Sequence, residues 1–114
     1  MRANQEIQNR VIEFLETFNE NIGRNLYFEE AICTSKENFD RHFTTFSSTE
    51  FILINFATRF SGARIMFIGE KLGYEICVDC IIKFNQNQDE LFFLEAYSEK
   101  IYRRTIIKLS NESY

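Results

Sequence analysis

The hydrophobic pattern of this chain changes its period near Ser47 and Ser48, and that change limits the folds open to it. Upstream, apolar side chains recur every three or four residues, as on one face of an α-helix. Downstream, apolar and polar side chains alternate, as along a β-strand with one buried face. A chain of 114 residues is long enough for one core but short for two. We therefore expect a single domain, residues 1–114, of the α+β class.

Three helices are expected before the change of period. Residues 4–22 carry an apolar stripe that ends at Gly23, which can adopt the left-handed conformation that closes a helix. A short second helix is expected over residues 25–32, with an asparagine as its N-cap. Residues 34–37 read Thr-Ser-Lys-Glu, which fits a capping box, and predict a third helix over residues 36–46.

Four or five strands are expected after it. The alternation predicts strands over residues 49–60, 63–68, 74–84 and 90–98, each followed by a Gly-containing or polar turn. Residues 101–109 fit a fifth strand or a terminal helix equally well. Because one sheet face must be buried, the expected architecture is a bent antiparallel sheet covered by the three helices.

Composition and charge exclude several classes of protein. The chain has 13 Phe, no Trp and no Pro, so its contacts should be dry and aromatic. A net charge of −4 has the wrong sign for a protein that neutralises nucleic-acid phosphates. Arg59 and Glu70 interrupt the most hydrophobic region, so no segment reaches the length of a membrane-spanning helix, and no secretory signal is visible. We expect a soluble, cytoplasmic protein with no nucleic-acid or membrane partner.

Neither a metal nor a cofactor is expected. Cys77 and Cys80 are the only cysteines at a suggestive spacing. On the strand expected over residues 74–84, side chains three apart point to opposite faces, so the two thiols should diverge and hold neither zinc nor a disulfide. The glycines match no phosphate-binding loop, and this excludes the usual nucleotide cofactors.

The hairpin expected from residues 74–84 and 90–98 offers the most informative candidate residues. If its apolar faces coincide, a symmetric register sets Asp79 across from Glu95, with Tyr97 on the same face. Ile81 and Phe93 share that face, which would then be either a dimer interface or a site. Opposed carboxylates would titrate as a pair.

Other titratable side chains are also candidates. His42 is the only histidine and thus the only side chain whose ordinary pKa lies near neutrality. The candidates for acid–base chemistry are therefore Asp79, Glu95, Tyr97 and His42. A basic segment near the C-terminus could hold an acidic partner or simply be a solvated face; it contains Lys100, Arg103, Arg104 and Lys108.

Two segments resemble a known family. Residues 73–84, GYEICVDCIIKF, and residues 90–97, ELFFLEAY, resemble the closing hairpin of NTF2-like (SnoaL-like) domains, and Ser35 to Phe46 resembles the helix that these domains place before the sheet. The resemblance implies a cone-shaped pocket under a lid of helices and homodimerisation through the sheet. It also implies functions that range from isomerase or dehydratase to pure binding, with no universal catalytic residue.

Three functions follow as hypotheses. The first is a non-catalytic, dimeric binding or protein-interaction domain with room for a small apolar ligand. The second is a small pocket enzyme that performs isomerase- or dehydratase-like acid–base chemistry. The third is an inhibitor or immunity-type protein, which a small acidic chain would suit.

Overall fold

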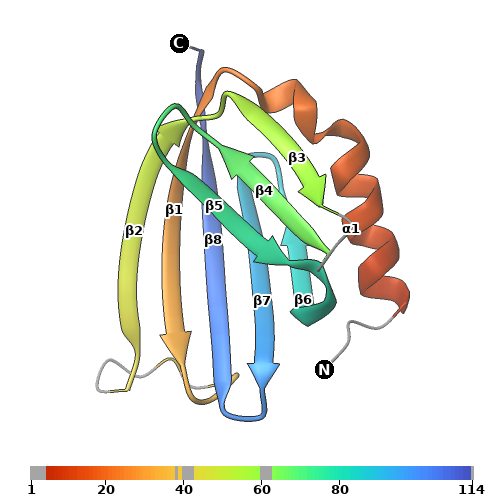
Figure 1. Cartoon of the computed structure of the whole chain (residues 1–114), viewed down its shortest axis with the longest axis vertical. Helices are drawn as coiled ribbons and strands as arrows, with labels where there is room; N and C mark the ends of the chain where they lie inside the picture. The colour runs from red at the N-terminus through yellow and green to blue at the C-terminus, as the bar shows by residue number, and fades with distance from the viewer. Residues whose placement is uncertain (1–4, 38, 40–42, 60–62, 114) are drawn as a thin grey trace.

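The computed structural model describes residues 5–37, 39, 43–59 and 63–113, which form two antiparallel sheets and one long helix (Figure 1). The helical elements are α1 (Gln5–Thr17) and two 3-10 turns, η1 (Phe18–Asn21) and η2 (Val78–Cys80). The large sheet has the order β2-β1-β8-β7-β6 and contains β1 (Arg24–Cys33), β2 (Thr45–Ile52), β6 (Ile81–Gln86), β7 (Glu90–Ser98) and β8 (Ile101–Ser113). The small sheet has the order β3-β4-β5 and contains β3 (Asn55–Arg59), β4 (Arg64–Ile68) and β5 (Gly73–Cys77).

The chain follows a simple meander through both sheets. β2 passes into β3 through Leu53 and Ile54, and β5 passes into β6 through η2, so each of these pairs carries the chain from one sheet to the other. β8 then returns to pair with β1. Figure 1 shows the small sheet crossing one half of the large sheet while α1 runs beside β6. The other half of the large sheet, toward the β7–β8 turn, has no strand over it in this view.

Phenylalanine rings fill the space between the sheets and the helix. Phe14 of α1 has its ring centroid 4.8 Å from that of Phe18, 5.5 Å from that of Phe84 and 5.8 Å from that of Phe93. Phe28 of the large sheet meets Phe67 of the small sheet at 5.6 Å. Tilted and edge-to-face pairs of this kind bury large apolar surfaces without leaving polar groups unsatisfied. The core therefore draws directly on the Phe-rich, Trp-free composition.

The expectation of three helices over a four- to five-stranded sheet is wrong after the first helix. The helix predicted over residues 4–22 is present as α1 and η1, and Gly23 follows with a φ of 96°. Residues 25–32 instead form β1, because Leu26 and Phe28 alternate with polar neighbours and the strand gains a ladder on each side, from β2 and β8. A lone helix of that length would make few backbone hydrogen bonds.

The third predicted helix is also absent from the described residues. The segment between β1 and β2 is irregular there, and the Ser35 hydroxyl accepts a long hydrogen bond of 3.4 Å from the Glu37 N–H in a local turn. Phe39 lies over Arg104, with the guanidinium carbon 4.6 Å from the ring centroid, and Phe46 belongs to β2. The helix-like spacing of Phe39 and Phe46 therefore does not reflect a helix, because one lies in the irregular segment and the other in a strand.

The strand predictions fared better. Those over residues 63–68 and 90–98 correspond to β4 and β7, and residues 101–109 are strand, within β8. The strand predicted over residues 49–60 is divided into β2 and β3 by the passage between sheets. The strand predicted over residues 74–84 is interrupted by η2 for the same reason.

Candidate functional site

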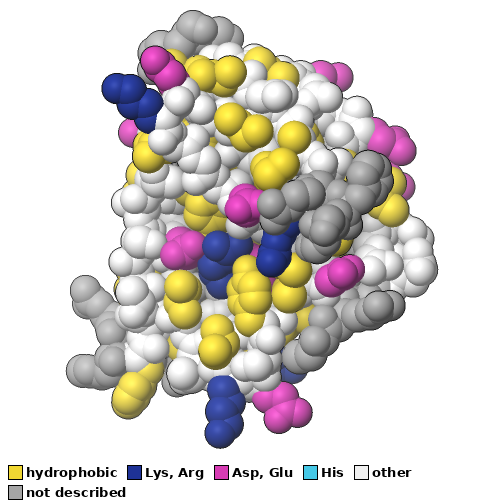
Figure 2. Space-filling view, viewed as in Figure 1, with side chains coloured by type: hydrophobic (Ala, Val, Ile, Leu, Met, Phe, Trp, Pro, Cys, Tyr) yellow, Lys and Arg dark blue, Asp and Glu magenta, His cyan; other side chains and the backbone are white. Residues whose placement is uncertain are grey.

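The half of the large sheet that the small sheet leaves uncovered carries most of the polar side chains that point inward. On the covered half, the inward side chains include Phe28, Leu91 and Ile107, all buried. Two residues nearer the β7–β8 turn, they include Glu30 on β1 and Thr105 on β8, which are paired in register. We call the uncovered part the open half; its residues are Glu30, Ile32, Glu95, Tyr97, Ile101 and Arg103. Figure 2 shows acidic and basic side chains next to each other in the middle of this face, with hydrophobic side chains around them.

Glu95 lies at the border of the open half, next to the end of β5, and is fully buried. Its Oε2 accepts hydrogen bonds from the backbone N–H of Cys77 at 2.8 Å and from the hydroxyl of Tyr97 at 2.5 Å. Its Oε1 accepts from Nε of Arg103 at 2.8 Å. A buried carboxylate is tolerated only when it is paired and hydrogen-bonded, and Glu95 meets both conditions.

Arg103 connects Glu95 to two other elements. Its Nη1 donates to Oε2 of Glu30 at 3.2 Å, and its Nη2 donates to the backbone carbonyl of Glu75 on β5. The guanidinium carbon lies 5.0 Å from the ring centroid of Tyr74 and 5.8 Å from that of Tyr97. Burial alone would lower the pKa of Arg103, but the hydrogen bond and charge of Glu95 outweigh burial and raise it. Arg103 is therefore a permanent cation.

Two tyrosines and a threonine complete this group. The hydroxyl of Tyr74 donates to Oε2 of Glu30 at 3.0 Å and lies 2.7 Å from Oγ1 of the buried Thr105. Burial raises the pKa of Tyr74, and burial together with Glu95 raises that of Tyr97, so both remain neutral phenols. We call the group the ionic cluster; it comprises Glu30, Tyr74, Glu95, Tyr97, Arg103 and Thr105.

The ionic cluster joins the sheets and has little freedom to do chemistry. Each oxygen of Glu95 and each guanidinium nitrogen of Arg103 already has a partner inside the protein. A general base needs a carboxylate that can turn toward the substrate proton, and three donors hold Glu95 in place, which it cannot release without unpairing a buried charge. The arrangement fixes the floor of the open half as a rigid polar surface.

Exposed apolar side chains border this floor. Ile32 stands directly across from Arg103 in the β1–β8 register. Ile101, two residues before Arg103 on the same strand, points to the same face. Ile101 is 50% exposed, and Ile32 and Tyr97 are each 41% exposed. The open half therefore combines Arg103 and Tyr97, two residue types that are enriched in protein interfaces, with exposed isoleucines.

Of the four predicted acid–base residues, the structure brings two together. Glu95 and Tyr97 are hydrogen-bonded neighbours on β7. Asp79 is exposed in η2, and Glu95 stands opposite Ile81 instead, so the predicted Asp79–Glu95 opposition is wrong. The cause is η2, which moves Asp79 out of the ladder. His42 lies outside the described residues.

The predicted dimer face is also wrong. Ile81 and Phe93 do share a face with Glu95, but both are fully buried in the core beneath the small sheet and α1. A sequence pattern alone cannot tell a core face from an interface, because both are apolar.

The sequence prediction missed the central role of Arg103. It was grouped with Lys100, Arg104 and Lys108 as a basic segment, yet Arg103 points inward, and Arg104 and Lys108 point to the outer face. The alternation of residues 101, 103, 105 and 107 along β8 was the available signal. This alternation shows that Arg103 points inward only if residues 101–109 are a strand, and the sequence fits a strand and a helix equally well.

The two cysteines at η2 differ from the expectation. The 3-10 turn replaces a regular strand between them, so the thiol of Cys80 lies near that of Cys77 instead of pointing away from it. Burial, followed by the contact with Cys77, raises the pKa of Cys80 to about 11. The predicted divergence of these thiols is therefore wrong; Cys77 is buried and Cys80 is partly buried.

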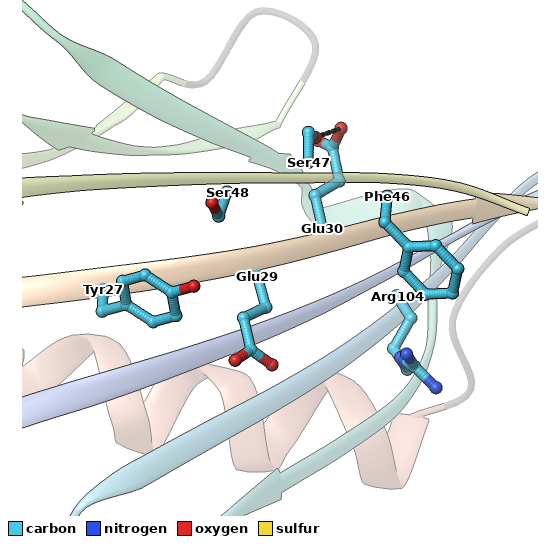
Figure 3. Close-up of a pocket in the computed structure, with 7 residues that line it drawn as sticks. All are labelled: Tyr27, Glu29, Glu30, Phe46, Ser47, Ser48 and Arg104. Carbon is cyan, nitrogen blue, oxygen red and sulfur yellow. Dashed lines mark hydrogen bonds between the residues drawn. The ribbon is translucent and has the colours of Figure 1, made fainter.

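A groove lies on the outer face of the large sheet, beside β2. It has a volume of about 360 Å³, and its lining includes Tyr27, Glu29, Phe46 and Arg104. Figure 3 shows Glu30, hydrogen-bonded to Ser47, on the opposite side of β1 from Glu29 and Arg104. Glu29 pairs with Lys108 at 3.0 Å, and Arg104 lies over Phe39, so the charges of this groove are already engaged.

Within the described ranges, no group of three or more His, Cys, Asp or Glu is arranged to hold a metal ion, and no helix is long and apolar enough to cross a membrane. No protein-family model, curated protein or solved structure matches this chain. The NTF2-like resemblance thus stays a prediction, and the helical lid that it implied is not part of the described structure.

Proposed function

We propose that this chain is a non-catalytic interaction domain that binds a protein partner through the open half. The observation that carries the proposal is that every charged side chain of the ionic cluster is paired within the protein, while Ile32, Tyr97 and Ile101 beside it are exposed. The polar groups are already fixed, and the apolar side chains next to them are already exposed to water. Binding therefore has a smaller entropic cost, because few side chains must be ordered.

The core favours a protein partner over a small apolar ligand. The predicted ligand pocket would lie between the sheet and its cover, where the rings of Phe14, Phe18, Phe28, Phe67 and Phe93 are packed in mutual contact. The saturation of Glu95 likewise weakens the enzyme hypothesis. A cytoplasmic location and self-association remain parts of the proposal, the second through a surface other than the buried face of Ile81 and Phe93.

Selection from a random peptide display library tests this function. Ile101→Asp places a charge on the open half, and Ile12→Asp is a matched control because Ile12 on α1 is 52% exposed and Ile101 is 50% exposed. Peptides selected on the wild-type protein should bind Ile101→Asp at least about tenfold more weakly and Ile12→Asp with unchanged affinity. Circular dichroism and thermal melting check that both variants fold.

The opposite result would count against the open half. If the library yields no binders, or if binders bind Ile101→Asp as tightly as wild type, the proposed function is wrong.

A further inference from the structure

The outer edge of β2 is a continuous, unprotected strand edge. β2 pairs with β1 from Ile52 to Thr45 without a shift in register, and it is the last strand of the large sheet on that side. It contains no proline and no lysine, the residues that usually blunt such edges. The opposite edge strand, β6, contains Lys83, has a register shift and packs against α1.

The backbone groups that face outward on β2 can be identified. Leu53 donates its N–H to the carbonyl of Arg24, and its carbonyl accepts from Gly23, so Leu53 faces β1. Ile54 donates to Ile68 on the other side. Because the direction alternates along a strand, the even-numbered residues of β2 face away from β1. Among the described residues, no backbone bond outside the ladder reaches these four: Phe46, Ser48, Glu50 and Ile52.

The side chains of β2 are complementary to those of β2 in a second copy of the chain. In an antiparallel pair of two β2 strands with a two-fold axis at Thr49, Phe46 stands opposite the partner's Ile52, and Ser48 opposite the partner's Glu50. Phe46 and Ile52 are 53% and 41% exposed, so the pairing removes from water two of the more exposed apolar side chains. An axis at Ser48 would oppose Phe46 to the partner's Glu50, and an axis at Glu50 would oppose two carboxylates.

We infer that two copies of this chain associate through β2, antiparallel and centred on Thr49, and form one continuous ten-stranded sheet from two five-stranded ones. The inference goes beyond the proposed function, because it names a second copy of this chain as a partner on a different surface. The outward backbone groups of Phe46, Ser48, Glu50 and Ile52 form the intermolecular ladder. The association uses a surface separate from the side chains of the open half.

Ser48→Pro tests the ladder without breaking the monomer. The N–H of Ser48 faces the free edge, so its loss leaves the β1–β2 ladder intact, and proline is tolerated at such a position. Light scattering and analytical ultracentrifugation should show a dimer for the wild-type chain and for Ser48→Ala. Ser48→Pro should raise the dimer dissociation constant at least about tenfold while circular dichroism remains unchanged.

A cysteine placed at the axis tests the register independently. Thr49 would stand opposite the partner's Thr49 in a non-hydrogen-bonded pair, where Cα atoms lie about 4.5 Å apart, within the range of a disulfide. Thr49→Cys should form a disulfide-linked dimer on mild oxidation, whereas Ser47→Cys, on the same face, should not. The wild-type chain controls for Cys33, Cys77 and Cys80.

Three results would overturn the inference: a wild-type chain that is monomeric at high micromolar concentration, a dimer that Ser48→Pro does not weaken, or equal cross-linking of Thr49→Cys and Ser47→Cys. None of them affects peptide binding at the open half, so the inference and the proposed function can fail separately.

Discussion

Glu95 of β7 and Arg103 of β8 stand directly opposite each other, and the Arg103 Nε donates to Glu95 Oε1 at 2.8 Å. The Glu95 side chain is fully buried, and the Arg103 side chain is 16% exposed. Through Glu30 and the carbonyl of Glu75, the same guanidinium reaches β1 and β5. One cross-strand pair therefore fixes the small sheet on the large one at the border of the open half.

Arg103→Met should destabilise the protein strongly. The substitution keeps most of the side-chain volume but leaves Glu95 buried without its cation, a change that costs about 3–5 kcal/mol in other proteins. Urea denaturation at neutral pH measures the loss in the free energy of unfolding.

The double variant Glu95→Leu/Arg103→Met provides the control for this prediction. It removes both charges, so it should recover a large part of the stability lost in Arg103→Met. Equal losses in the single and double variants would mean that Glu95 is not the group that Arg103 stabilises.

Tyr97→Phe should lose stability at neutral pH by about 1–2 kcal/mol, because the hydroxyl that donates to Glu95 is removed. The loss should shrink in alkali. The pKa of Tyr97 is raised in the folded state, so its contribution is complete below the ordinary tyrosine pKa of about 10 and is lost as the pH rises above that value. Urea titrations at about pH 8 and about pH 11 compare the variant with the wild type. A difference that stays constant with pH would contradict the prediction.

The sequence predicted the strands well where pairing is local. β4 and β7 follow from an alternation read within a few residues, and Glu95 and Tyr97 were placed on one face by the same rule. The errors come from longer-range effects. Residues 25–32 become a strand because β8, about 80 residues further along, pairs with them, and the local alternation of Leu26 and Phe28 with polar neighbours does not reveal that partner.

The ionic cluster shows the same limit. Glu30, Tyr74 and Arg103 lie on three strands that are distant in sequence, and only the register of β1 with β8 and the crossing of β5 bring them together. The expected opposition of Asp79 and Glu95 is wrong because a three-residue 3-10 turn interrupts an otherwise regular alternation. Candidate residues within one hairpin could be predicted, but their partners in other strands could not.

Gly69→Ala should destabilise the protein by about 1–3 kcal/mol through overpacking. A Cβ at this position would lie 2.7 Å from a ring carbon of Phe51, which is buried where the β4–β5 connection crosses β2. Gly73→Ala is the matched control, because its Cβ would meet only the carbonyl of Phe67 at 3.4 Å, an ordinary contact. Thermal melting of both variants should separate them, and equal melting temperatures would show that Phe51 moves aside freely.

Cys80 should react slowly with an aromatic disulfide reagent at about pH 8, although it is only partly buried. Its pKa is raised from 9.0 to about 11, which lowers the thiolate fraction about 100-fold, while the greater basicity of the thiolate returns about tenfold in intrinsic reactivity. The net expectation is a rate about tenfold below that of the same thiol in urea. Cys77→Ala removes the neighbouring thiol that helps to raise this pKa, so Cys80 should react faster in that variant. Mass spectrometry of the peptide that contains Cys80 measures both rates, and a folded rate equal to the unfolded one would show that neither burial nor Cys77 protects this thiol.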